Sequence, residues 1–125
     1  MGKRRIIRKA KSNEVVLGRA RWCQSFWCHF RGLQFVRHLD DDEGLLFVTN
    51  GESIVNTTIH MFFMFMDIAV VWLDSSGKVV DKKLAKRWRP AYAPRQAAQY
   101  YIEAPVSLLE RVEIGDVLEF NEETD

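Results

Sequence analysis

IHMFFMFMDIAVVWLD, residues 59–74, is the most apolar stretch of the chain, and any fold has to bury it. A membrane-spanning helix needs about 20 mostly apolar residues. This stretch is shorter and is interrupted by His60 and Asp67, and an acid is costly inside a bilayer. We therefore expect a buried part of a globular domain, with no membrane-spanning segment and no membrane partner.

The second half of the stretch predicts a strand. Ile68–Leu73 is rich in β-branched and aromatic residues, and turn residues follow it at Asp74–Gly77. A short apolar run bounded by a turn is typical of a buried strand, and the chain from Lys78 onward is expected to return beside it as a hairpin. Ile59–Met66 is expected to form a further strand, with a bend at Asp67. We interpret its Met and Phe side chains as core packing, in preference to a cofactor site.

The composition is that of one globular domain with unevenly placed charges. The chain has 125 residues, of which 47% are hydrophobic and 28% charged, and a formal net charge of +1. These values are ordinary for a single soluble domain and argue against disorder. We expect a basic mobile arm at 1–12, a single globular domain at 13–121 and an acidic tail at 122–125. The apolar run after the basic start is too short for a secretory signal, which predicts a cytoplasmic location.

The two cysteines, Cys23 and Cys28, match no metal or haem motif. Their spacing is not that of haem attachment, and no second pair of ligands completes a zinc site. If both residues lay on one helix, positions five apart would point to different faces. We therefore expect free, reduced thiols and no metal or other cofactor.

A short helix is predicted after Ser25, whose hydroxyl can accept a hydrogen bond from a first-turn amide. Phe26, Phe30 and Leu33 follow at helical spacing and share one face. Gly32, near the helix end, allows close packing or a left-handed exit.

Weaker signals fill in the other elements. Asp40–Glu43 is expected to be a solvated acidic turn, Asn50-Gly51 a turn and 89–95 an irregular loop with two prolines. A second short helix is expected at 106–112. The remaining strands are predicted at 14–20, 45–48, 100–102 and 117–120.

Short motifs in a characteristic order run from Ser25 to Phe120. They are Ser25-Phe26-Trp27, Arg31-Gly32-Leu33, Glu43-Gly44-Leu45-Leu46, either Ser53-Ile54 or Ile59-His60, Phe62-Phe63-Met64, Val70-Val71, Leu73-Asp74, Gly77, Trp88-Arg89, Glu103-Ala104-Pro105 and Gly115-Asp116. In this order they resemble the domain of unknown function 192 family of small bacterial and archaeal proteins. The resemblance implies an α+β, mainly β fold, in which an antiparallel sheet forms a small, partly open barrel with two short helices. It implies no reaction, because the family has no established one.

The chain departs from the family pattern in its polar positions. The family often reads His-Thr-Phe-Phe-Met-Arg-Phe-Pro-Ile-Asp, where this chain has Phe65 for the Arg, Asp67 for the Pro and Ala69 for the Asp. The polar residues that still match the family are His60 and Trp88-Arg89.

Three functions are compatible with these residues. The first is a non-catalytic binding module for a small ligand or a protein partner, with His60, Trp88, Arg89 and Glu103 lining a shallow pocket. It agrees with the lack of any nucleophile elbow, metalloprotease motif or phosphate-binding glycine loop. The second is an enzyme in which His60 and either Asp67 or Glu103 form an acid/base pair. Since no motif brings that pair together, the sequence leans against catalysis without excluding it.

The third function is association with nucleic acid through the basic arm and the segment 82–95. Basic residues between aromatic ones are typical of single-stranded nucleic-acid surfaces. The same composition also suits an exposed edge strand, where cationic side chains discourage aggregation. The basic residues concerned are Lys82, Lys83, Lys86, Arg87 and Arg95.

Overall fold

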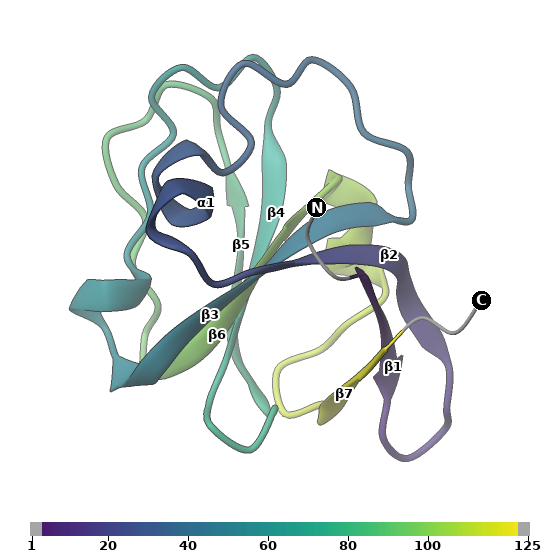
Figure 1. Cartoon of the computed structure of the whole chain (residues 1–125). Coiled ribbons are helices and arrows are strands. Elements are labelled where there is room, and N and C mark those ends of the chain that lie inside the picture. The colour runs from purple at the N-terminus through teal and green to yellow at the C-terminus, as the bar shows by residue number, and fades with distance from the viewer. Residues whose placement is uncertain (1–3, 123–125) are drawn as a thin grey trace.

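The computed structural model describes residues 4–122, and its strands form one strongly curled sheet (Figure 1). The strand order is β5-β4-β6-β3-β2-β1-β7. The elements in chain order are β1 (Arg4–Lys9), β2 (Val15–Cys23), α1 (Phe26–Arg31), β3 (Glu43–Ser53), the 3-10 helix η1 (Val55–Thr57), β4 (Ile68–Leu73), β5 (Val79–Ala85), β6 (Ala98–Ala104), the 3-10 helix η2 (Val106–Glu110) and β7 (Leu118–Glu122).

The sheet curls into a half-barrel because its two edge strands approach each other. Lys78, just before β5, forms an isolated bridge with Val117, just before β7. The amide of Leu118 donates to the carbonyl of Gly77 at 2.9 Å. A mainly β, partly open barrel with few helices is therefore confirmed.

One strand pair departs from the expected antiparallel sheet. β2 and β3 pair in parallel, whereas every other pair within the described sheet is antiparallel. Parallel neighbours need a crossover long enough to return the chain to the same end of the sheet. Here α1 and the loop after it, residues 24–42, make that crossover.

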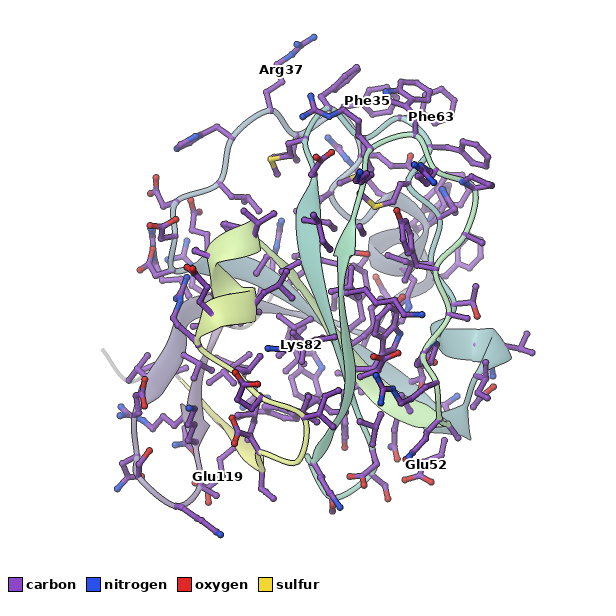
Figure 2. The ribbon with its side chains drawn as sticks, turned by 180° about the vertical axis from the view of Figure 1, so that it is seen from behind. Phe35, Arg37, Glu52, Phe63, Lys82 and Glu119 are labelled. Atoms are coloured by element: carbon purple, nitrogen blue, oxygen red, sulfur yellow. A yellow bond between two sulfur atoms is a disulfide. The ribbon has the colours of Figure 1, made fainter. Side chains whose placement is uncertain are left out.

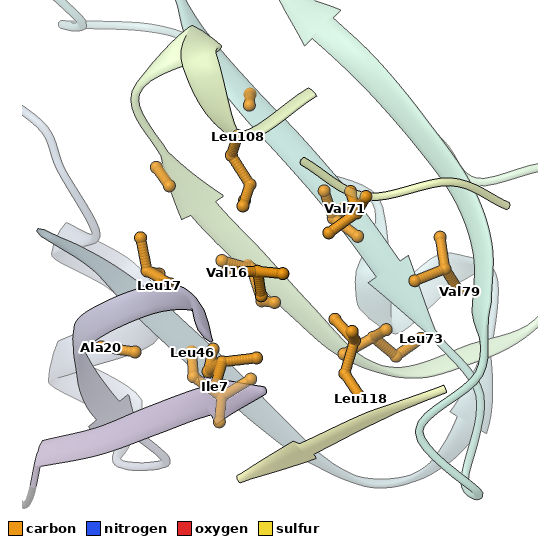
Figure 3. Close-up of a cluster of buried hydrophobic side chains, with 14 of the residues drawn as sticks. Ile7, Val16, Leu17, Ala20, Leu46, Val71, Leu73, Val79, Leu108 and Leu118 are labelled. Carbon is orange, nitrogen blue, oxygen red and sulfur yellow. The ribbon is translucent and has the colours of Figure 1, made fainter. Parts of the chain in front are cut away.

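The central strand β4 lies where the sequence predicts it. All six of its residues are buried, and it pairs with β5 on one side and β6 on the other. Ala69, Val71 and Leu73 join the cluster of apolar side chains enclosed by the curl of the sheet (Figure 3). Ile68 and Trp72 point the other way, into a second cluster. Alternation along one strand thus supplies both cores.

The strand predicted at Ile59–Met66 is wrong. The only ladder contact that the structure describes there is an isolated bridge between Ile59 and Tyr92, and Phe63 has a left-handed φ of 62°. The segment is an irregular loop over the second core, and Ile59 and Met61 form main-chain hydrogen bonds to the loop 86–92. The core role of its methionines is confirmed, since Met61 and Met64 are buried.

The basic mobile arm is also wrong for the described residues. Arg4–Lys9 forms β1 between β2 and β7, and residues 10–12 form the turn that follows it. Ile7 is fully buried in the first core, so a single apolar side chain anchors a strand whose other residues are mostly cationic. The rest of the predicted arm, residues 1–3, and residues 123–125 of the predicted acidic tail lie outside the described residues; residue 122 of that tail ends β7.

The helix α1 begins as predicted. Ser25 is its N-cap, and its Oγ accepts a hydrogen bond from the amide of Cys28 at 3.2 Å. The shared apolar face is buried only at Leu33, beyond the helix end. Phe26 and Phe30 are 73% and 61% exposed, because α1 contacts the sheet through Cys28 and His29 instead.

Cys23 and Cys28 form a disulfide, so the prediction of free thiols is wrong. The prediction compared two positions on one helix, whereas Cys23 is the last residue of β2 and only Cys28 lies on α1. The chain turns between them and brings their Cα atoms to 5.5 Å, which suits a disulfide. The bond attaches α1 directly to the end of β2.

Two local predictions need smaller changes. The second short helix is the 3-10 helix η2, Val106–Glu110, which is shorter than the expected 106–112. Asn50-Gly51 does not end a strand, since β3 continues through an irregularity to Ser53. Within residues 4–122, no helix is long and apolar enough to cross a membrane.

Candidate functional site: a pocket at Glu103

Glu103 is a buried carboxylic acid in the middle of the sheet. It lies on β6 between β3 and β4 and is only 7% exposed. Its side chain has no hydrogen bond or ion pair to any other residue in the described range 4–122. Burial raises the pKa of Glu103 to about 8, because a low-polarity surrounding disfavours the charged form. The carboxyl group is therefore mainly neutral at pH 7.

Glu103 borders a cavity of about 80 Å³ between α1 and the loop 58–64. Gly32, at the end of α1, forms part of the wall, and a Cβ atom at that position would lie 3.5 Å from Oε1 of Glu103. His60 also lines this cavity, from the loop side. His60 and Glu103, which the sequence analysis assigned to one pocket although they are distant in the chain, thus border the same cavity.

The inner wall is held in place by a chain of hydrogen bonds. His29 Nε2 lies 2.9 Å from the carbonyl of Val48, and its Nδ1 lies 3.4 Å from the hydroxyl of Tyr101. In this arrangement Nε2–H donates to the carbonyl and the tyrosine hydroxyl donates to Nδ1. Tyr101 stacks on Phe47 with ring centroids 4.5 Å apart. Burial, and to a smaller extent Glu103, raises the pKa of Tyr101, which keeps the phenol protonated.

Trp88 and Arg89 do not line this cavity. Both hold Met61 through the main chain, since the Trp88 amide donates to the Met61 carbonyl and the Met61 amide donates to the Arg89 carbonyl. The Trp88 ring packs against Phe63, with centroids 5.4 Å apart, and the Phe63 ring stacks on Phe35 (Figure 2). Neither Trp88 nor Arg89 therefore borders the cavity that His60 and Glu103 share.

Sequence reasoning missed His29, Gly32 and Tyr101 as parts of the pocket. One of them carried a usable signal, because Tyr101 precedes Glu103 by two positions and side chains two apart share a face of a strand. His29 and Gly32 reach the pocket only because α1 packs on the sheet, which no local pattern encodes.

The cationic side chains of segment 82–95 are mostly used inside the protein. Lys82 Nζ donates to the carbonyls of Leu109 and Val112 at 2.8 and 2.7 Å (Figure 2). Lys83 and Arg95 converge on the buried carboxylate of Asp81, at 3.7 and 3.5 Å. These contacts favour a structural role for the three residues.

Arg87 is paired as well, with the acid that replaces the family proline. Asp67 Oδ1 accepts hydrogen bonds from the amide and Nε of Arg87, at 2.9 and 3.0 Å, and these bonds lower the pKa of Asp67. Asp67 thus attaches the end of the loop 59–66 to the residues just after β5. It pairs with Arg87 and not with His60. Among the five cations, the side chain of Lys86 alone has no hydrogen bond or ion pair in the described part of the chain. A nucleic-acid role for this segment stays a prediction.

The half-barrel and its buried pocket define a small, mainly β class of protein. A family model described as "DUF192: Uncharacterized ACR" matches residues 6–120. The chain belongs to this family, and the resemblance carried by its motifs is confirmed.

Several relatives from archaea share the name UPF0127 protein. The UPF0127 protein TK1120 of Thermococcus kodakarensis is 47% identical over 103 residues, which are 81% of this chain and 64% of that protein. A UPF0127 protein of Thermococcus gammatolerans is 42% identical over 93% of this chain and 74% of its own length. UPF0127 protein PF1050 of Pyrococcus furiosus is 34% identical, over 93% of this chain and 97% of its own length. This chain spans less than two thirds of TK1120.

Two crystal structures share the fold. One, of a "putative transcription regulator" from Sinorhizobium meliloti 1021, is 19% identical and has a TM-score of 0.81 over 96% of this chain and 94% of that one. The other, of a protein of unknown function from Novosphingobium aromaticivorans, is 17% identical and has a TM-score of 0.74 over 93% and 83%. At these identities the likeness shows the fold alone. The cytoplasmic location stays a prediction.

Proposed function

We propose that this chain is a non-catalytic binding module whose pocket at Glu103 holds a small polar group, either a free ligand or a side chain of a protein partner. One observation carries the proposal: a buried carboxyl group borders a cavity and has no hydrogen-bond partner within residues 4–122. Leaving a buried polar group unpaired costs about 1–3 kcal/mol. A bound group that pairs with Glu103 removes that cost.

The protonation state of Glu103 indicates the chemistry of the bound group. A neutral carboxyl offers one O–H donor and one carbonyl acceptor, and burial keeps Glu103 in this form at neutral pH. A primary carboxamide presents the matching acceptor and donor on one carbon atom. The cavity of about 80 Å³ has room for such a group, since one water takes about 30 Å³ of liquid. An asparagine or glutamine side chain of a partner carries the same group.

The surroundings of Glu103 support binding over catalysis. His29 uses both ring nitrogens in hydrogen bonds to the protein. The one hydroxyl of an aliphatic residue along the described wall, that of Thr58, donates to the carbonyl of Ile54. A nucleophile needs an adjacent base within hydrogen-bond reach, and neither residue forms such a pair.

Acetamide is a probe of the right size and chemistry, and acetone is its matched control without the N–H donors. A molecule with so few non-hydrogen atoms, at about 1 kcal/mol each, binds at about 1 mM. We expect acetamide to shift the amide resonances of Gly32 and Glu103 in a saturable manner in a ¹H–¹⁵N spectrum. Acetone is expected to bind several-fold more weakly, because the Glu103 carbonyl stays unpaired.

Two substitutions separate chemistry from shape. Glu103→Gln keeps one donor and one acceptor and is expected to retain acetamide binding, whereas Glu103→Met fills similar space without hydrogen bonds and is expected to lose it. Native mass spectrometry of the purified protein, compared with its denatured mass, reports any ligand that co-purifies. A bare native mass together with acetamide shifts that persist in Glu103→Met would contradict the proposal.

A further inference from the structure

A second, larger cavity lies beside α1 and is lined by arginine and tryptophan. It measures about 980 Å³, the upper end of the range of about 300–1,000 Å³ typical of ligand sites. A neighbouring cavity of about 370 Å³ shares Arg21 and Leu45 with it and adds Arg4. We name the larger one the arginine groove and define it by Arg5, Arg21, Trp22, Trp27 and Arg31.

The cations of this region differ from those of segment 82–95, because several lack an acidic partner. Arg4, Arg21 and Arg31 are exposed, and none forms an ion pair with a carboxylate of the described residues. Arg19 is the exception near the groove, since it is held by Asp40 and Asp42. Three positive charges are therefore available to a ligand along β1, β2 and the end of α1, with Arg4 in the neighbouring cavity.

Aromatic faces accompany these charges. The Arg5 guanidinium lies 4.4 Å from the centroid of the Trp22 ring, a cation–π arrangement. Trp27 is 72% exposed on α1 and meets Phe26 and Phe30 in edge contacts. An exposed indole beside arginine offers stacking area and charge to the same ligand.

The disulfide holds the two sides of the groove together. Trp27 and Arg31 come from α1, whereas Arg21 and Trp22 come from the end of β2. The Cys23–Cys28 bond joins these two elements, and Cys28 itself lines the groove. The bond therefore holds α1 to the end of β2, beside the hydrogen bond that joins His29 of the same helix to the Val48 carbonyl.

We propose that the arginine groove binds single-stranded nucleic acid. Arginine forks pair with phosphate oxygens, and a base can stack on an exposed indole, as sequence-tolerant single-strand binders do. A duplex is not the expected partner, because reading its major groove requires an inserted helix or ribbon with polar side chains. α1 instead presents Phe26, Trp27 and Phe30 to solvent.

This site is separate from the pocket at Glu103, although Arg31 and Gly32 border both cavities. It also differs from the nucleic-acid surface predicted from segment 82–95. The nucleic-acid hypothesis drawn from the sequence used the basic arm and the segment 82–95. Arg4 and Arg5 of that arm belong to the present proposal, whereas the segment 82–95 does not.

Fluorescence anisotropy of labelled dodecauridylate tests the proposal. Three arginine–phosphate contacts predict a slope of about −2 in log affinity against log salt, so affinity is expected to fall about 20-fold from about 50 to about 200 mM salt. We expect UMP to bind at least ten-fold more weakly. Trp27→Ala is expected to weaken dodecauridylate binding about 10-fold or more, and Arg21→Gln or Arg31→Gln to make the salt slope shallower by about 0.7 each.

Lys86→Gln is the matched control, because it removes an exposed cation without a described partner from the other basic segment. We expect it to leave the affinity within two-fold of the unsubstituted protein, and thermal melting checks that every variant is folded. Three results of the nucleotide-binding measurements would overturn the proposal. They are absence of salt-dependent binding, equal loss of affinity in Lys86→Gln and Arg21→Gln, and UMP binding as tightly as dodecauridylate. Binding to vesicles of phosphatidylglycerol and phosphatidylcholine, with no oligonucleotide binding, would overturn it in favour of a lipid surface.

Discussion

Gly32 lies directly against Glu103, since a Cβ atom at Gly32 would be 3.5 Å from Oε1 of that carboxyl group. Gly32 also has a φ of 50° and a ψ of −129°, and its amide donates to the Cys28 carbonyl at the end of α1. Gly32 therefore ends α1 and, because it has no side chain, also leaves the space beside Glu103 unfilled. The disulfide at Cys28 secures the same helix, so the fold and the pocket share one support.

Gly32→Ala is expected to destabilise the protein by about 1–3 kcal/mol, because an L side chain is strained in this backbone conformation. The new methyl group also contacts the Phe47 ring at 3.5 Å. Urea denaturation measures the change in the free energy of unfolding. Gly51→Ala is the control, since a Cβ there meets nothing within 4 Å and no left-handed φ is present. Equal stability of the two variants would contradict the constraint at Gly32.

The raised pKa of Glu103 predicts a pH dependence of stability. The pKa is about 8 in the folded protein against 4.5 ordinarily, so between these values the folded state binds more protons than the unfolded state. Stability is then lost as the pH rises, by about 1.4 kcal/mol per pH unit for a single group. Glu103→Gln removes the titration, and its stability is expected to fall less steeply from about pH 5 to about pH 8.

Chemical denaturation at several pH values provides the comparison. Glu119→Gln removes one carboxylate from the exposed side of β7 and reports the effect of net charge alone. If Glu103→Gln and the unsubstituted protein lose stability in parallel over this range, Glu103 is not a buried neutral acid.

The Cys23–Cys28 disulfide contributes to stability through the unfolded chain. For a loop this short, the chain-entropy model assigns about 2 kcal/mol to the cross-link. We expect a reductant to lower the melting temperature of the unsubstituted protein and to leave that of the Cys23→Ala/Cys28→Ala variant unchanged. Alkylation under non-reducing conditions followed by mass spectrometry counts the free thiols, and two modified thiols would contradict the bond.

The closure of the half-barrel depends on Gly77. Its φ is 87°, and a Cβ atom there would lie 2.6 Å from the carbonyl oxygen of Leu118. Leu118 begins β7, the strand that faces β5 across the open side of the half-barrel. Gly77→Ala combines a clash with backbone strain, and we expect a loss of about 3 kcal/mol or more. Urea denaturation beside Gly51→Ala measures it. A loss no larger than that of the control would mean that the two edges do not meet.

Lys82 and Lys86 test the structural interpretation of the basic segment. Lys82 Nζ donates to the carbonyls of Leu109, in η2, and of Val112, and removing this partner from largely buried carbonyls is expected to cost about 1–3 kcal/mol. Lys86→Ala removes a cation of the same kind from an exposed position and is expected to change stability by no more than about 0.5 kcal/mol. Thermal unfolding of Lys82→Ala and Lys86→Ala distinguishes the roles, and equal stabilities would argue against the Lys82 contacts.

The amino-acid sequence by itself determined the elements whose signal is local. β4 follows from its run of β-branched residues and the turn after it, and the start of α1 from the hydroxyl of Ser25. The ordered motifs identified the family, and with it the half-barrel. Each of these depends on neighbours in sequence or on a pattern preserved along the whole chain.

Only the tertiary structure decided the rest, because those features depend on contacts between segments that are distant in sequence. β1 is a strand because β2 and β7 flank it and Ile7 reaches the core. Cys23 and Cys28 can bond because the chain leaves a strand and enters a helix between them. Glu103 borders a cavity because α1 ends at Gly32 directly above it. Spacing along the chain does not report such proximity, since packing of the sheet, helix and loops produces it.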